Sequence, residues 1–140
     1  MTGKCFKMTA MQILLDTCAI IWSVAEPKQL SPAARDTLTL DETEVWISPI
    51  SCAEVACAAD RGRITLDRHW RLWFRYYGDL NNWQLKNIGL DVMEEAYSLP
   101  GPFHQDPADR IIVATARKMG CPIITSDQKI LNYPHVQTIW

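Results

Sequence analysis

Short apolar runs alternate with helical segments along the 140 residues of this chain, and this alternation restricts the folds open to it. The apolar runs are typical of strands that are buried on both faces. Strands that alternate with helices pair in parallel, and the helices cover both sides of the sheet. The sequence therefore predicts an α/β domain with a central parallel sheet. Its strands are expected over residues 12–15, 44–48, 83–88, 121–125 and 136–140.

Helix-start signals separate these strands. Ser31-Pro32 and Asp106-Pro107 each place an N-cap side chain directly before a proline at the first helical position. Further N-caps are expected at Asp16, Asp91 and Asp127, and a capping box from Ser51 to Glu54. The helices are expected over residues 18–24, 32–40, 51–61, 67–77, 91–96 and 110–119, with a short helical turn after residue 127.

The composition excludes several classes of protein. The chain has 14 Lys and Arg against 16 Asp and Glu, a formal net charge of -2, which argues against broad nucleic-acid binding through bulk positive charge. Its hydrophobic content of 48% argues against a disordered chain. No apolar stretch approaches the roughly 18 residues that a membrane span needs.

Length and cysteine usage predict one domain in a reducing compartment. A single domain is expected over residues 11–140, after a disordered leader at residues 1–10. A signal peptide is not expected, because Asp16 interrupts the only short apolar run near the start. The five cysteines are odd in number and form no Cys-x-x-Cys pair, so reduced thiols are expected rather than disulfides or a zinc site. These features predict a cytoplasmic protein.

Four carboxylates fall near the carboxyl ends of the predicted strands. Asp16 follows the first strand, and Asp127 follows the fourth. Glu54 and Asp109 are expected in the first turns of two helices. The carboxyl ends of parallel strands lie at one edge of the sheet, where ligands bind in open α/β folds. Each acid alone is explained as a helix cap, but the four together predict an acidic cluster at that edge.

A carboxylate cluster restricts the chemistry of such a site. Two carboxylates about 4 Å apart repel by roughly 4 kcal/mol at an effective dielectric constant of about 20, so the cluster takes up protons or binds a cation. Carboxylate oxygens without Cys or His at ligand spacing favour Mg²⁺ or Mn²⁺. These ions support phosphodiester hydrolysis, because they lower the pKa of the attacking water and stabilise the leaving oxygen.

Four motifs occur in order along the chain. They are LLDT at residues 14–17, SPISCAEVA at 48–56, HQDPADRIIVATA at 104–116 and CPIITSD at 121–127. With these motifs the chain resembles PIN-domain ribonucleases of the VapC toxin type, from about residue 11 to residue 140. The resemblance implies a three-layer α/β/α PIN-like fold and a Mg²⁺- or Mn²⁺-dependent endoribonuclease that is toxic when free. It also implies a cognate VapB-like antitoxin of a type II toxin–antitoxin system. A homodimer and a toxin–antitoxin hetero-oligomer are the expected assemblies, with no membrane association.

The resemblance also assigns roles to individual residues. Carried over by position, the family's catalytic and metal-binding quartet falls on Asp16, Glu54, Asp109 and Asp127. A second group, expected to support the quartet, consists of Asp106, Thr17, Thr125, Ser126 and Arg110. In that group Thr125 and Ser126 are expected to hydrogen-bond the last acid or a metal-bound water. Arg110 is expected either to contact an RNA phosphate or to anchor a site carboxylate, and His104 is interpreted as a loop residue.

Several alternatives stay open at this point. A phosphatase of the haloacid dehalogenase type requires Asp-x-Asp after the first strand, where this chain has Asp16, Thr17 and Cys18, and a receiver domain requires an acidic pair there. A PIN-fold RNA-processing nuclease that is not a toxin and a non-catalytic binding module of the same fold are both compatible with the sequence. The aromatic side chains expected on the helix at residues 67–77 suit the core, a partner interface or base stacking.

Overall fold

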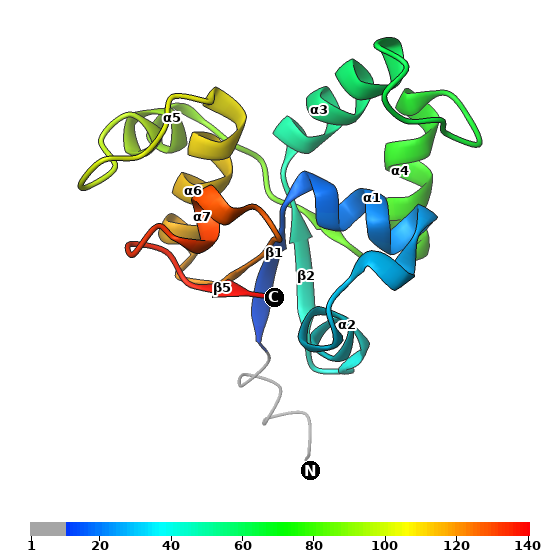
Figure 1. Ribbon diagram of the computed structural model, residues 1–140, viewed down its shortest axis with the longest axis horizontal. Helices are drawn as coiled ribbons and strands as arrows, with labels where there is room; N and C mark the ends of the chain where they lie inside the picture. Colours follow the sequence, from blue (N-terminus) through cyan, green and yellow to red (C-terminus); the bar gives the residue numbers. More distant parts are fainter. Residues whose placement is uncertain (1–10) are drawn as a thin grey trace.

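A computed structural model describes residues 11–140 of the chain, and the leader expected at residues 1–10 lies outside the described residues. Five parallel strands form one sheet in the order β3-β2-β1-β4-β5, so the first strand of the chain lies in the centre (Figure 1). The predicted parallel sheet is confirmed, although β3, β4 and β5 are shorter than expected. The strands are β1 (Gln12–Leu15), β2 (Glu44–Ile47), β3 (Gln84–Leu85), β4 (Ile123–Ile124) and β5 (Thr138–Ile139).

Helices cover both faces of this sheet, as the sequence predicts. The first four α-helices lie on one side of the central strands, and the last three lie on the other (Figure 1). The α-helices are α1 (Thr17–Ala25), α2 (Pro32–Thr39), α3 (Pro49–Asp60), α4 (Trp70–Leu80), α5 (Leu90–Ala96), α6 (Pro107–Met119) and α7 (Gln128–Leu131). A short 3-10 helix, η2 (Pro27–Gln29), was not predicted. The architecture is therefore the expected three-layer α/β/α arrangement.

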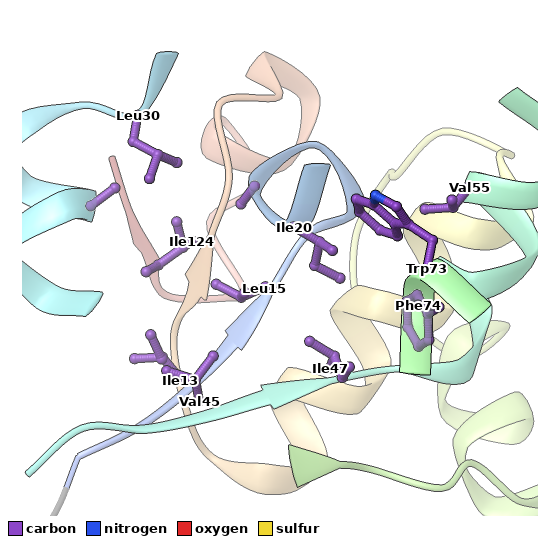
Figure 2. Close-up of a cluster of buried hydrophobic side chains, with 12 residues drawn as sticks. Ile13, Leu15, Ile20, Leu30, Val45, Ile47, Val55, Trp73, Phe74 and Ile124 are labelled. Atoms are coloured by element: carbon purple, nitrogen blue, oxygen red, sulfur yellow. The ribbon is translucent and has the colours of Figure 1, made fainter. Parts of the chain in front are cut away.

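The central strand β1 supplies side chains to two hydrophobic cores, because successive residues of a strand point to opposite faces. Ile13 and Leu15 pack with Trp73 and other apolar side chains on the side of α1 to α4, as Figure 2 shows. Leu14 packs on the opposite side, with Ile112 and further side chains of α6 and α7. The continuous apolar run that ends at Leu15 is thus required by burial on both faces.

Four helix starts form as the sequence predicts. The side chains of Asp16, Ser31, Asp106 and Asp127 each accept a hydrogen bond from a backbone N–H in the first turn of the following helix. At its other end α6 stops at Gly120, whose φ of 67° lies in the left-handed region that glycine adopts most easily. These local signals fix the ends of the elements that lead into the sheet edge.

The start of α3 differs from the prediction, and the difference moves a candidate residue. The capping box expected from Ser51 is wrong, because the N-cap is Ser48, whose hydroxyl accepts a hydrogen bond of 3.2 Å from the backbone N–H of Ile50. Pro49 then occupies the first helical position, where its missing N–H carries no cost. Glu54 therefore lies beyond the first turn of α3, deeper in the helix than expected.

Two further helix starts were wrongly predicted by a few residues. Helix α5 follows Gly89 as its N-cap, so Asp91 lies inside the first turn rather than before it. Helix α4 begins at Trp70 rather than near residue 67, and the ring of His69 caps it by accepting a hydrogen bond from the backbone N–H of Arg71.

Helix α4 divides its large side chains between the core and the surface. Trp73 is only 2% exposed, and Phe74 is also buried, so the core interpretation of this aromatic helix is confirmed for these two. Leu72, Tyr76 and Leu80 lie on its outer face at helical spacing and are all exposed. We call these three residues the α4 stripe.

The structure also bears on the predictions about membrane-spanning helices and cysteines. Within residues 11–140, no helix is long and apolar enough to cross a membrane. The cysteines of this part of the chain, Cys18, Cys52, Cys57 and Cys121, are free thiols, as the sequence predicts.

Trp73→Ala is expected to lower the free energy of unfolding by about 3–5 kcal/mol, because it removes a large side chain from the core between α4 and the sheet. Leu72→Ala on the same helix is the matched control, because Leu72 is 60% exposed, and it is expected to change stability by less than about 0.5 kcal/mol. Urea denaturation of both variants measures the difference. Equal losses would contradict the assignment of these two residues to core and surface.

Candidate active site

The structure brings the four predicted acids to one edge of the sheet. Asp16 directly follows the central strand β1, and Asp127 follows its neighbour β4. Glu54 comes from α3 in one helical layer, and Asp109 comes from the first turn of α6 in the other. The negative charges of Asp16, Asp127 and Glu54 all act on the carboxyl of Asp109, which places the four groups in one electrostatic environment. We refer to these four residues as the acidic cluster.

Neutral donors hold Asp16 at the centre of this cluster. The side chain is 5% exposed. One carboxylate oxygen accepts a hydrogen bond of 2.8 Å from the backbone N–H of Thr17, and the other accepts one of 2.6 Å from the hydroxyl of Thr125. Burial raises the pKa of Asp16, with a smaller rise from the charge of Asp127, and the hydrogen bonds oppose it. Asp16 is thus oriented by its neighbours but not neutralised by them.

A thiol adds a third neutral contact to Asp16. The sulfur of Cys18 lies 3.6 Å from its carboxylate as a weak donor. Burial, and then the charge of Asp16, raise the pKa of this thiol to about 11, so it remains protonated near neutral pH. The hydroxyl of Ser126 lies 3.7 Å from the same sulfur. Ser126 therefore contacts Cys18 rather than the acid that the sequence assigned to it.

Two hydroxyls connect α1 to Glu54. The Thr17 hydroxyl donates to a carboxylate oxygen of Glu54, and its oxygen lies 2.8 Å from the hydroxyl oxygen of Ser51. Because Thr17 has one hydroxyl proton and gives it to Glu54, Ser51 must be the donor in the second contact. Burial raises the pKa of Glu54 and the Thr17 hydrogen bond opposes this, while Asp16 is the first of three acids whose charges add to the rise.

Thr125 links the two strand-end acids. Its hydroxyl donates to Asp16 and at the same time accepts a hydrogen bond of 3.0 Å from the backbone N–H of Asp127. The Asp127 carboxylate in turn accepts one of 2.8 Å from the backbone N–H of Lys129 at the start of α7. The hydroxyl of Thr125 thus supports both of these acids, by contacts of opposite sense.

Asp109 has the most strongly perturbed carboxyl of the cluster. Burial raises its pKa to about 7, and the charges of Asp16, Asp127, Asp106 and Glu54 add to the rise, in that order. Asp106 itself is exposed and caps α6 by accepting a hydrogen bond of 3.0 Å from the backbone N–H of Asp109. A carboxyl with this pKa is half protonated near neutral pH unless a cation stabilises its charge.

His104 is a site residue that the sequence interpretation missed. Its Nε2 lies 2.9 Å from a carboxylate oxygen of Asp109, in a direction that makes no hydrogen bond, and both side chains are mostly buried. Its Nδ1 accepts a hydrogen bond of 3.4 Å from the backbone N–H of Asp106. The proton of the neutral ring is therefore on Nε2, facing Asp109. The one sequence feature that could have indicated this role is the position of His104, two residues before the N-cap of α6.

Arg110 does not anchor a site carboxylate, which was one of its two expected roles. Its three nitrogens donate to backbone carbonyls of Ala96, Phe103 and His104, at distances of 2.8–2.9 Å. The guanidinium therefore fastens the loop before α6 to that helix instead of anchoring a carboxylate. Through this loop Arg110 fixes the backbone that carries His104 beside Asp109.

The donor chemistry of the cluster fits a hydrated divalent cation. Within residues 11–140, no three Asp, Glu, His or Cys side chains come close enough to form a ready-made metal site. In the same part of the chain no Lys or Arg forms an ion pair with any of the four acids. Mg²⁺ suits such an arrangement, because it keeps several waters and binds directly to only one or two carboxylates. Burial and the charges of neighbouring acids raise the pKa values of Asp16, Glu54 and Asp109, and a bound cation would oppose this rise.

Comparison with known proteins finds relatives that match nearly the whole chain. The family model for the PIN domain matches residues 13–136. Ribonuclease VapC22 from Mycobacterium tuberculosis is 32% identical over 132 residues, which cover 91% of this chain and 98% of that protein.

Solved structures share the fold at lower sequence identity. A toxin–antitoxin complex from Klebsiella pneumoniae contains a chain that is 23% identical, with a TM-score of 0.63 and coverage of 89% of this chain and 94% of that one. VapBC2 from Rickettsia felis, bound to a DNA fragment from its promoter, contains one that is 14% identical, with a TM-score of 0.67 and coverage of 91% and 97%.

Asp109→Asn is expected to make the metal-free protein more stable above pH 7. The pKa of Asp109 in the folded state is about 7, against an ordinary value of 3.8, so between these values the native state holds a proton that the unfolded chain has lost. The stability of the unmodified protein therefore falls as the pH rises from about 4 to about 7, by up to roughly 4 kcal/mol for this group. Urea denaturation in EDTA at pH 5.5 and pH 8 measures this decrease in the free energy of unfolding. The decrease is expected to be smaller in the Asp109→Asn variant.

Asp106→Asn is the matched control for this experiment, because it removes an exposed acid of the same helix start and keeps a residue that can cap. It is expected to retain most of the fall. An Asp109→Asn protein that is less stable than the unmodified protein at pH 8 would show that the carboxylate stabilises the helix rather than crowding the cluster.

Proposed function

This chain belongs to the PIN-domain family, and from that premise we propose that it is a Mg²⁺- or Mn²⁺-dependent endoribonuclease that acts as the toxin of a toxin–antitoxin module. One observation carries the proposal: four carboxylates from both helical layers lie at the carboxyl edge of the sheet, where the charges of the other three raise the pKa of Asp109, and no Lys or Arg of residues 11–140 pairs with them. The similarity to a ribonuclease over 91% of the chain supports the same activity. Such an enzyme would meet its RNA in the cytoplasm.

The proposed metal-binding residues are Asp16, Asp127, Asp109 and Glu54. A divalent cation bound there would neutralise the phosphodiester and lower the pKa of a water molecule. Asp16 is suited to the central position, because Thr17 and Thr125 fix both of its oxygens without adding a charge. The cation would in turn lower the pKa of each acid and keep it ionised at neutral pH.

The remaining chemistry falls to groups around these acids. Glu54 has a raised pKa and one oxygen held by Thr17, so its other oxygen is suited to accept a proton from the attacking water. The Nε2 of His104 lies beside Asp109 without a hydrogen bond to it, so this nitrogen is suited to supply a proton to the leaving oxygen. Arg110 acts only indirectly, as a positioning residue for the loop that carries His104.

The proposed partner is a VapB-like antitoxin. Solved proteins with this fold include toxin–antitoxin complexes from several bacteria. The α4 stripe offers an exposed apolar surface to a partner chain, in keeping with the interface interpretation of this helix. We propose a toxin–antitoxin hetero-oligomer built on a homodimer. A PIN-fold RNA-processing nuclease that is not a toxin would share the site but would not stop growth when expressed alone.

Asp16→Asn is expected to reduce RNA cleavage by at least about 100-fold, because the central metal-binding carboxylate loses its charge. The measurement is the rate of cleavage of single-stranded RNA by the purified protein in Mg²⁺ or Mn²⁺. Asp36→Asn is the matched control, because Asp36 is an exposed acid on α2, and it should cleave at the unmodified rate. Equal cleavage by both variants would mean that the activity does not arise at the acidic cluster.

Mn²⁺ is expected to raise the melting temperature of the protein through the same residues. A ligand that binds only the native state stabilises it, by about 1.4 kcal/mol at ten times its dissociation constant. Differential scanning fluorimetry with and without Mn²⁺ should show an increase of several degrees for the unmodified protein and for Asp36→Asn, and a much smaller one for Asp16→Asn. No increase in any of the three would favour a non-catalytic binding module of the same fold.

A further inference from the structure

A cavity lies beside the acidic cluster. It has a volume of about 420 Å³, and its walls come from the loop before α6 and from the end of α7 with the segment that follows. The side chains that matter here are Phe103, His104, Lys129, Asn132, Tyr133 and His135. The walls are mainly apolar and aromatic, and no Asp or Glu lines them. We call this space the aromatic cavity.

Ring packing gives the aromatic cavity a fixed shape. The centroids of Phe103 and Tyr133 are 4.7 Å apart, and those of Tyr133 and His135 are 5.3 Å apart. Tyr133 is buried, and its hydroxyl donates a hydrogen bond of 2.5 Å to the carbonyl of Pro100. Gly101, with a φ of +66°, lets the loop turn against His135, whose ring would lie 3.6 Å from a Cβ at that position. These contacts preform the walls before any ligand arrives.

Two residues connect the aromatic cavity directly to the acidic cluster. His104 lines the cavity, and its Nε2 lies 2.9 Å from a carboxylate oxygen of Asp109. Lys129 also lines the cavity, and its backbone N–H donates to Asp127. One residue therefore separates a molecule in the cavity from each of two of the four acids.

We propose that the aromatic cavity binds one unpaired base of the RNA substrate and so sets which phosphodiester bond reaches the acidic cluster. This inference rests on the proposed ribonuclease function. A flat heteroaromatic base matches walls made of aromatic rings, on which unpaired bases stack. The side chains of Asn132 and His135 supply hydrogen-bonding groups for the edge of the base, and the ammonium of Lys129 attracts its phosphate. A base in a duplex cannot enter, so the substrate is unpaired at that nucleotide.

Another cavity also carries aromatic walls and is the main rival. It has a volume of about 440 Å³ between α3, α4 and β3, and its lining includes Trp70, Phe74 and Trp83. Its charged lining residues are Arg71, Arg75 and Asp79, so its charge does not exclude a phosphate. However, none of its side chains hydrogen-bonds to the acidic cluster. The aromatic cavity is therefore the better place for a base whose phosphate must reach the metal-binding acids.

The first test measures RNA binding without cleavage. In the catalytically silent Asp16→Asn background, fluorescence anisotropy gives the affinity for a labelled single-stranded RNA of mixed sequence. His135→Ala and Phe103→Leu are each expected to weaken binding by about 5- to 100-fold, the range expected for one stacked base. Trp70→Leu, in the rival cavity, is expected to leave the affinity unchanged. Because His135 is exposed, its replacement should not disturb the core, and circular dichroism is the check that both cavity variants are folded.

The second test uses the active protein on a pool of random single-stranded RNA. The unmodified protein should prefer one kind of base beside the cleaved bond, and His135→Ala should flatten this preference by raising KM while leaving kcat within about twofold. Lys28→Ala is a control for Lys129→Ala, because Lys28 is exposed on η2 in the other helical layer. Of these two lysine variants, only Lys129→Ala should raise KM.

The outcomes separate the two proposals. Normal cleavage with an unchanged base preference and affinity in the cavity variants would overturn the base site and leave the ribonuclease function intact. Loss of base preference in Trp70→Leu instead would also overturn it, in favour of the rival cavity. No cleavage by the unmodified protein would overturn the proposed function and with it this inference. Weakened binding of a protein partner, with RNA binding unchanged, would show that the cavity receives an aromatic side chain rather than a base.

Discussion

The burial of an ionisable carboxylate at the end of the central strand is the constraint on which the rest of the site depends. Asp16 is 5% exposed, and its contacts are a backbone N–H, a hydroxyl and a thiol. All three donors are neutral, so they fix the direction of the carboxylate without cancelling its charge. A buried charge without a counter-ion is costly, and it is either protonated or stabilised by a cation from solution. The fold thus places at its centre a carboxylate that a bound cation would stabilise.

The topology brings further carboxylates to the same edge of the sheet. Because β1 lies between β2 and β4, the helix that follows β2 (α3) and the helix that leads into β4 (α6) both begin at the same edge of the sheet, on opposite faces (Figure 1). Glu54 enters from one layer and Asp109 from the other, and each feels the charge of Asp16. Hydroxyls of Thr17, Ser51 and Thr125 hold the cluster together where charged partners would otherwise be expected. Because these contacts are neutral and no Lys or Arg of the described residues pairs with the acids, the negative charge of the cluster can act on a bound cation.

Local sequence signals predicted those parts of the fold that depend on local contacts. Asp106-Pro107 and Gly120 define the two ends of α6, because capping and a left-handed turn involve only neighbouring residues. Ser51 was misassigned because two serines compete at the start of α3, and the local pattern fits both. Ser48 takes the cap, and Ser51 is drawn into a hydrogen bond with Thr17 in α1, a residue 34 positions away. No local pattern contains that contact.

The same distinction explains the acids and their neighbours. The positions of the four carboxylates follow from strand ends and helix starts, so sequence order alone could bring them to one edge. The roles of His104 and Arg110 follow from the path of the loop before α6, which three guanidinium hydrogen bonds determine. The expected role of Arg110 as a ligand of phosphate or carboxylate rested on its place beside Asp109. The carbonyls that it binds instead became neighbours only through tertiary folding.

The electrostatics of the whole chain then bear on how RNA can approach. The net charge of -2 gives no broad attraction for a polyanion, and the acidic cluster repels one locally. In the proposed enzyme, substrate and site therefore carry the same sign, and cations between them strengthen the binding of RNA at the acidic cluster. This couples RNA binding to metal binding, so the affinity for RNA would itself depend on divalent ions rather than only the chemical step. The aromatic cavity is lined by Lys129 and by no acid, so stacking there can hold the RNA while its phosphate turns toward the acids.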